Sequence, residues 1–91
     1  MKYTLVLHPQ AQSDLKDIPA RYRRRLINLI NGLAQDPYPA RSKQLEDPLA
    51  HLRRLPLDQW RVIYDVMDEE QEVNIYHVRL KTGPETYEDL D

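Results

Sequence analysis

Arg61 is the residue of this sequence whose type and setting point most directly to chemistry. It lies in the stretch DQWRVIYDV, residues 58–66, which has the β-branched and aromatic composition of a buried strand. Side chains alternate between the two faces of a strand, so Arg61 shares its face with Ile63 and Asp65. The opposite face carries the apolar residues Trp60, Val62, Tyr64 and Val66. Arg61 would then point to solvent or to a ligand, where a guanidinium can hold two phosphate oxygens and stay charged. The alternative is a surface arginine that pairs with Asp58 or Asp65.

Two further arginines lie one predicted strand earlier in the chain. Arg53 and Arg54 are neighbours and point in opposite directions in a regular strand, so at most one of them can join Arg61. A bulge near Pro56 would exchange the two.

A third group of polar residues lies on the last predicted strand. His77, Arg79 and Lys81 are spaced two apart and therefore share one face. An unperturbed imidazole has a pKa near ~6.5, so His77 could exchange a proton at neutral pH. The alternative for His77 is a strand residue that bonds to a neighbour. The histidines of the chain show no metal-ligand spacing, and we expect no metal site and no cofactor.

The elements that must position these residues begin with a strand and two helices. Residues 2–7, KYTLVL, have the composition of a strand. Pro9 suits the first position of a helix, in which Ala11, Leu15 and Ile18 form one apolar stripe. A second amphipathic helix should begin near Pro19 and end near Asp36. Its apolar face consists of Tyr22, Leu26, Leu29, Ile30 and Leu33.

The second half of the chain has the residue composition of β-strands. Residues 36–48 contain three prolines and are expected to be a connection, and the runs 49–57, 59–67 and 72–80 are expected to be sequential antiparallel strands. The sequence therefore predicts an α+β fold of order β-α-α-β-β-β. In it, two N-terminal helices pack on one face of a four-stranded, mainly antiparallel sheet, over a single domain of residues 1–91. The other sheet face, if open, is where a ligand could lie.

Composition limits the class of protein. The chain has 91 residues, a net charge of −2 and no cysteine. No apolar run approaches the ~20 residues of a membrane span, so we expect a cytoplasmic protein without membrane contact. A nucleic-acid binder is usually basic, yet the charges here are segregated, and the net value can hide a local positive site.

Four segments together resemble the RelE/ParE superfamily of toxins from bacterial type II toxin–antitoxin modules. YTLVLHPQAQSDLKDIP resembles the family's first strand and helix, and LINGLAQDPYP the end of its second helix. KQLEDPLAHLRRLPLDQWRVIYDV resembles the central signature, and VNIYHVRLKTGPETYEDL the last strand and a C-terminal basic-then-Tyr element. The ordered set spans about the whole chain.

The resemblance to the RelE branch, which is favoured, implies a metal-independent endoribonuclease that cleaves messenger RNA, typically on the ribosome, by attack of the 2′-OH. Resemblance to the ParE branch implies inhibition of DNA gyrase instead. Either branch implies a cognate antitoxin that silences the toxin. A third possibility is a degenerate toxin that only binds its antitoxin.

The resemblance also assigns roles to residues. Arg61 matches the strand arginine that stabilises the phosphate, and Arg54 matches a basic position one strand earlier, which favours Arg54 over Arg53. Lys81 matches a basic residue before the terminal tyrosine, with Arg79 as the alternative, and Tyr87 matches that tyrosine. The predicted catalytic residues are therefore Arg61, Arg54, Lys81 and Tyr87, and the predicted substrate-binding residues are Arg53, Arg79 and His77. A basic residue is frequent in the family at the position of Leu52, and this departure weakens the case for a full general base.

Overall fold

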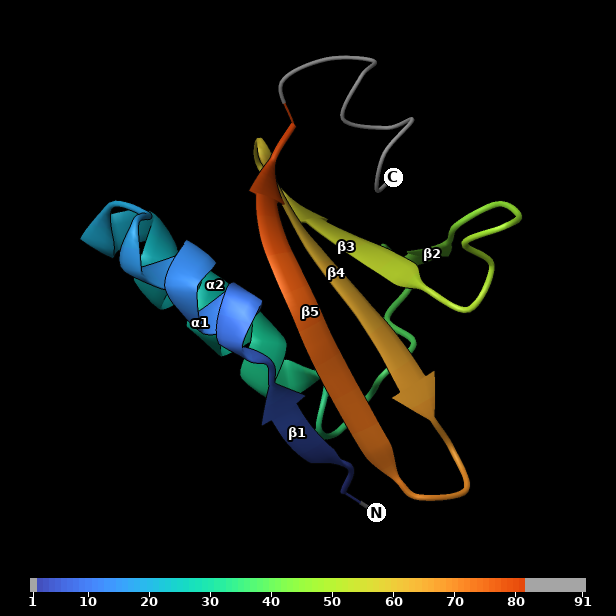
Figure 1. Ribbon diagram of the computed structural model, residues 1–91. Coiled ribbons are helices and arrows are strands. Elements are labelled where there is room, and N and C mark those ends of the chain that lie inside the picture. The colour runs from blue at the N-terminus through green and yellow to red at the C-terminus, as the bar shows by residue number, and fades with distance from the viewer. Residues whose placement is uncertain (1, 82–91) are drawn as a thin grey trace.

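The molecule is a mixed sheet with two helices on one face (Figure 1). The structure, a computed structural model, describes residues 2–81. The elements are β1 (Thr4–Leu7), α1 (Pro9–Lys16), α2 (Ala20–Gly32), β2 (Lys43–Gln44), β3 (Arg53–Leu57), β4 (Trp60–Met67) and β5 (Glu72–Leu80). The strand order across the sheet is β1-β5-β4-β3-β2. The pair β1 and β5 is parallel, and the other neighbouring pairs are antiparallel.

The α+β class and the two-helix layer predicted from the sequence are confirmed, whereas the strand count differs. A fifth strand, β2, forms inside the segment that was expected to be a connection. Both helices are also shorter than the apolar stripes predicted, and α2 ends at Gly32 rather than near Asp36. Turns occupy residues 33–35, where Leu33 still packs in the core.

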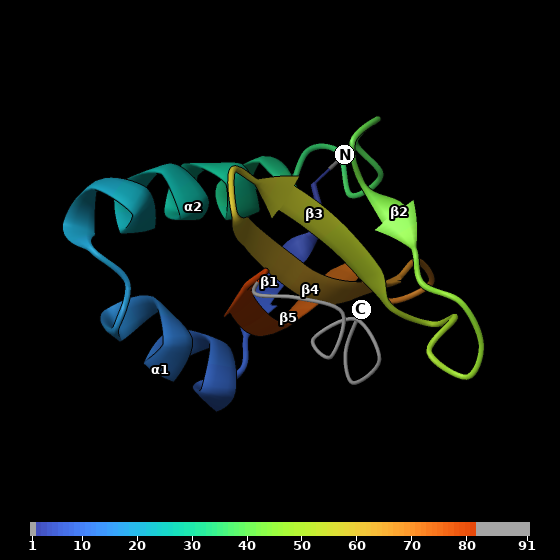
Figure 2. The same ribbon diagram turned by 90° about the horizontal axis from the view of Figure 1, so that it is seen from above.

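Prolines and one arginine shape the helical hairpin. Pro9 occupies the start of α1, where its missing N–H removes no hydrogen bond, and Pro19 is the residue before α2. Arg23 of α2 donates to the carbonyl oxygen of Ile18 at 3.0 Å, in the turn between the helices. The two helices consequently form a hairpin whose arms diverge from the turn between them (Figure 2).

The main core lies between the helices and the sheet. The apolar stripes of α1 and α2 meet the residues of β3, β4 and β5 that point toward the helices. The most buried side chains of this layer include Leu26, Leu33, Leu55, Val62, Tyr64, Val73 and Ile75. As alternation predicts, Arg61 is excluded from this core cluster, so the strand separates scaffold from candidate site.

A bulge shifts the pairing register of β5 with β4, and a contact from α1 holds β5 in position. The pairing of β4 with β5 shifts between Ile63 and Tyr64, which leaves Tyr76 as the extra residue of β5. Beyond the end of β1, the carboxylate of Asp14 on α1 accepts the main-chain N–H of Val78 at 2.9 Å. These contacts fix the part of β5 that carries His77 and Arg79.

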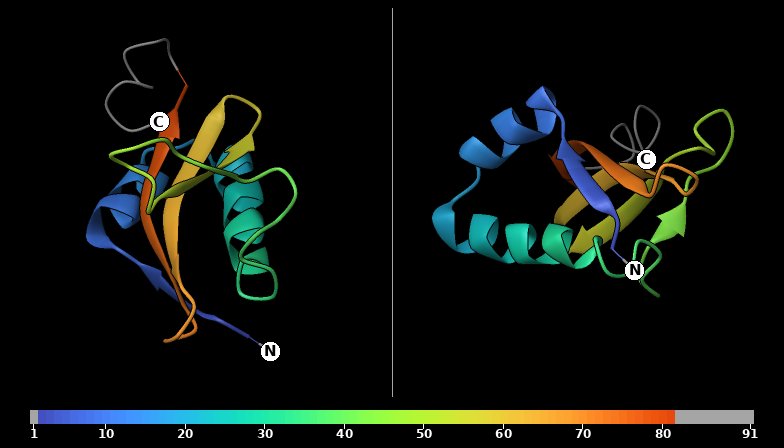
Figure 3. Two further views of the ribbon diagram at one scale, coloured as in Figure 1. Left: turned by 90° about the vertical axis from the view of Figure 1, so that its right-hand side faces the viewer. Right: turned by 90° about the horizontal axis from the view of Figure 1, so that it is seen from below.

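A second, smaller apolar cluster covers part of the opposite sheet face. Leu45, Leu52 and Ile63 are buried there, with Leu49 and Tyr76 packed against them. The segment between β2 and β3 runs across this face (Figure 3, left). The face away from the helices is therefore partly covered, and the basic residues share this face with the small apolar cluster.

Asp68 ties three segments together at one end of the sheet. Its carboxylate accepts hydrogen bonds from the hydroxyl groups of Tyr3 at 2.8 Å and Tyr38 at 2.6 Å. These bonds lower the pKa of Asp68 and raise the pKa of Tyr38 to about 12.

Within residues 2–81, no helix is long and apolar enough to span a membrane.

Candidate functional site

Strand register brings the predicted basic residues other than Arg53 to one face. Arg61 lies opposite Arg79 of β5 on one side and opposite Pro56 of β3 on the other. Paired residues point to the same side of a sheet, and that side is opposite to the helices. In the next row Ile63 lies opposite Arg54 and His77, which therefore point the same way. We call Lys43, Arg54, Arg61, His77, Arg79 and Lys81 the cationic face.

Lys43 is a member of this face that the sequence did not reveal. It pairs with Arg54 across β2 and β3 and extends the row to the last strand of the sheet. Its strand has two residues, too few for an alternating pattern. Leu45, two positions later, was a usable signal for the direction of Lys43, because its apolar side chain is buried on the same face.

Lys81 continues the ladder just past the end of β5. Its main-chain N–H donates to the carbonyl oxygen of Gln59 at 2.7 Å, and its position two residues after Arg79 places it on the cationic face. Tyr87, the remaining predicted catalytic residue, lies outside the described residues.

Arg61 is the most buried cation of the face. Only 6% of its surface is exposed, and its pKa is lowered, first by burial and then by the positive charge of Arg54. A negatively charged group beside these two arginines would oppose both effects on the pKa of Arg61. The acids considered as partners for Arg61 make other contacts: Asp58 pairs with Arg25 at 2.8 Å, and Asp65 accepts the hydroxyl of Tyr76 at 3.1 Å.

The surroundings of His77 favour the neutral form of its imidazole. Burial, followed by the nearby charge of Arg79, lowers its pKa, while Asp14 opposes the shift. A guanidinium nitrogen of Arg79 lies 3.4 Å from Nδ1 of His77. Arginine has no acceptor, so Nδ1 must accept in this contact, which places the ring proton on Nε2. The contact is of the kind expected for a strand histidine that bonds to a neighbour, and it leaves the imidazole able to exchange a proton.

Leu52 occupies a position two residues before Arg54 and is buried in the small apolar cluster with Leu45 and Ile63. An apolar side chain there supplies neither charge nor a proton acceptor. Its packing holds the segment between β2 and β3 against the sheet, beside the cationic face.

Arg53 points to the helix-covered side. It pairs with Tyr64, its Nη2 donates to the hydroxyl of Ser42 at 2.9 Å, and its guanidinium lies 5.0 Å from the ring centre of Tyr38. The ladder of β3 with β4 is regular past Pro56, so no bulge exchanges the two arginines. The structure thus brings Arg54, and not Arg53, together with Arg61.

The cationic face can bind and polarise a phosphodiester. Arginine and lysine stabilise charge on phosphate oxygens, and a preorganised set can favour the transition state of phosphoryl chemistry. No group of three or more potential metal-binding side chains occurs within residues 2–81.

Comparison with known proteins supports this fold and its kinship. The model of a family described as the ParE toxin of type II toxin–antitoxin systems matches residues 5–81. A chain of the toxin–antitoxin complex RelBE2 from Mycobacterium tuberculosis is 26% identical with a TM-score of 0.81, covering 88% of this chain and 92% of that one. A chain of the archaeal RelE–RelB complex from Pyrococcus horikoshii is 25% identical with a TM-score of 0.79, covering 92% and 100%. The isolated RelE toxin of E. coli is 20% identical with a TM-score of 0.75, covering 96% and 93%, and shares the fold. A comparison with curated proteins found no match.

Proposed function

The chain belongs to the ParE toxin family of type II toxin–antitoxin systems, within the RelE/ParE superfamily, and we propose that it is a metal-independent endoribonuclease that cleaves messenger RNA. The observation that carries this proposal is the convergence of Arg54, Arg61 and Arg79 from three neighbouring strands on one sheet face. Several guanidinium groups on one face suit a phosphate, because each planar fork can hold two phosphate oxygens and stay charged.

The proposed reaction is an internal transfer at one phosphodiester. The 2′-oxygen attacks phosphorus and loses its proton, the bond to the 5′-oxygen breaks, and that oxygen gains a proton. Arg61 and Arg54 stabilise the negative charge that builds on the phosphate oxygens. Lys81 and Arg79 flank the same phosphate or the next one.

The described residues of this site include few groups that could carry out the proton transfers of the reaction. Arginine and lysine stay charged at neutral pH, so His77 is the described member of the cationic face that can exchange a proton there. Its neutral ring could accept the 2′-OH proton at Nδ1 once Arg79 turns to the phosphate. By family resemblance Tyr87 would position the attacking oxygen or stack on a base.

The proposed partners follow from the same kinship. Solved relatives with RelE-type folds are described as toxin–antitoxin complexes. We therefore propose a cognate antitoxin as the protein partner, with messenger RNA on the ribosome as the substrate. Both place the activity in the cytoplasm.

Inhibition of DNA gyrase is the second candidate, because the matching family model is that of the ParE toxin. Loss of catalysis with retention of antitoxin binding is the third, because Leu52 is apolar and packed. Expression in a bacterial host separates the three. The proposal expects growth arrest by the natural chain, no arrest by Arg61→Ala, and no effect of the purified protein on DNA supercoiling by gyrase. Arrest by both chains together with blocked supercoiling would support gyrase, and no arrest by either chain would support a degenerate toxin.

A further inference from the structure

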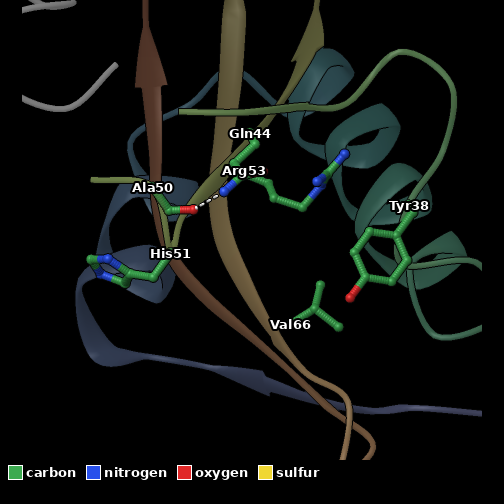
Figure 4. Close-up of a pocket in the computed structure, with 6 residues that line it drawn as sticks. All are labelled: Tyr38, Gln44, Ala50, His51, Arg53 and Val66. Atoms are coloured by element: carbon green, nitrogen blue, oxygen red, sulfur yellow. Dashed lines mark hydrogen bonds between the residues drawn. The ribbon is translucent and has the colours of Figure 1, made fainter. Parts of the chain in front are cut away.

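A pocket of about 200 Å³ lies away from the cationic face, beside the loop that follows α2. It is lined by Tyr38, Gln44, Ala50, His51, Arg53 and Val66. Figure 4 shows the side chain of Arg53 extending toward Tyr38, with His51 at the other end. Because Arg53 and Arg54 point to opposite sides of β3, this pocket and the cationic face are separate sites.

Arg53 is fixed in place without an anionic partner. Ser42 holds its Nη2 at 2.9 Å and in turn donates to the carbonyl oxygen of Pro39 at 2.8 Å, while the ring of Tyr38 supports the guanidinium. Within residues 2–81, the buried Nε of Arg53 has no hydrogen-bond acceptor, and no carboxylate pairs with the guanidinium. A half-buried cation in this state gains most from a negatively charged acceptor.

The positive charge of the pocket suits a ligand that carries a single negative charge. Arg53 supplies one fixed positive charge, and the nearby carboxylate of Asp68 accepts the hydroxyl of Tyr38 at 2.6 Å. A dianionic phosphate would need more positive charge than this pocket offers, whereas a carboxylate fits the planar fork of one guanidinium.

Within residues 2–81, no further strand pairs with the main chain beside the pocket. The N–H of Leu45 donates to the carbonyl oxygen of Leu52 at 3.0 Å, so alternation along the ladder turns the N–H and C=O of Gln44 away from β3. β2 is the last strand of the sheet, and Gln44 is exposed. An extended peptide can add to such an edge with its side chains beside Arg53.

We propose that this pocket binds the carboxylate of an Asp or Glu side chain in an extended peptide segment of a partner polypeptide that pairs with β2. The guanidinium of Arg53 and the main chain of Gln44 recognise the segment together. The site does not depend on RNA cleavage, because Arg53 points away from the cationic face.

NMR titration of the full ¹⁵N-labelled chain tests this proposal, with Arg61→Ala included so that the protein can be produced. The probes are the capped peptides Ac-Ser-Val-Glu-Val-Ser-NH₂ and its Gln counterpart, and sodium acetate. We expect the Glu peptide to shift the Nε–H signal of Arg53 and the main-chain N–H signal of Gln44 saturably. The Gln peptide should bind at least about fivefold more weakly, since a charged hydrogen bond is lost.

Matched variants assign the effect to one arginine. Arg53→Gln should remove the difference between the two peptides, and Arg54→Gln, one residue away on the other side, should retain it. Arg53→Lys keeps the charge without the planar fork and should reduce the difference, which covers the case of a Gln variant that does not fold. Equal binding of both peptides, binding of neither, or an acetate response at Arg53 as strong as the peptide response without a shift at Gln44 would each overturn the proposal.

Discussion

Arg61 of β4 and Arg79 of β5 lie directly opposite each other on the same face of the sheet. Like charges in this position destabilise a sheet, so a pair of arginines is not what folding alone would favour. Arg54 adds a third positive charge, which contributes to the lowered pKa of Arg61. The proposal of an anion site on this face rests on this concentration of charge.

Removal of one charge from the pair should stabilise the protein. We expect Arg79→Gln to raise the free energy of unfolding by about 0.5 kcal/mol, because repulsion across the strands is relieved. Urea denaturation measures the change. Arg24→Gln is the matched control, since Arg24 is exposed on α2 in the other layer of the molecule, and it should have almost no effect. A decrease in stability for Arg79→Gln would contradict a repulsive pair.

Lys43 should contribute one phosphate contact when RNA lies on the cationic face. The slope of log K against log salt changes by about 0.7 for each contact with single-stranded nucleic acid. We therefore expect Lys43→Gln to flatten the salt dependence of binding by about 0.7, with 2′-O-methyl RNA as a ligand that cannot be cleaved. Lys16→Gln on α1 is the control and should leave the slope unchanged. The same slope for Lys43→Gln and the natural chain would remove Lys43 from the site.

The predictions from sequence succeeded where strand alternation was sufficient. The period of two placed Arg61 opposite to Trp60 and Tyr64 and required Arg53 and Arg54 to separate. The register confirms both points. The helices were similarly visible, because their apolar stripes repeat at helical spacing and face the core.

Contacts distant in sequence were the part that could not be predicted. Lys43 reaches the cationic face only because a two-residue strand pairs with β3, which no local pattern indicates. The burial of Leu52 likewise depends on Leu45 and Ile63, from two other segments. The position of β1 beside β5 was not evident either. This parallel pair joins segments near the two ends of the described chain, and no local sequence pattern indicates such a pairing.

Leu52 should stabilise the segment between β2 and β3. Truncation of a buried leucine removes apolar contacts and leaves a cavity, so we expect Leu52→Ala to lower the free energy of unfolding by about 2 kcal/mol. Thermal and urea unfolding measure this loss. Leu80→Ala removes the same atoms from a side chain that is 37% exposed, and it should cost less than about 1 kcal/mol. Equal losses for the two variants would contradict a packed cluster around Leu52.

Asp68 should make stability depend on acid. Its pKa is lower in the folded protein than the usual 3.8, because Tyr38 and Tyr3 donate to its carboxylate. The stabilisation is therefore present above pH 3.8 and lost as the pH falls through the lowered value. Melting temperatures measured from pH 6 to pH 2 should fall less steeply for Asp68→Asn than for the natural chain. Glu70→Gln, on the same turn, is the control, and an Asp68→Asn curve parallel to that of the natural chain would contradict the linkage.

Cleavage of messenger RNA in a translating extract tests the central claim most directly. The purified toxin, freed of its antitoxin and kept in chelator during purification, is added to the extract, and primer extension maps new 5′ ends on a defined message. The account predicts cuts by the natural chain and by Arg24→Ala, and at least a hundredfold slower cutting by folded Arg61→Ala, because a charge-stabilising group is lost. Absence of cleavage by the natural chain, or equal cleavage by Arg61→Ala, would contradict it.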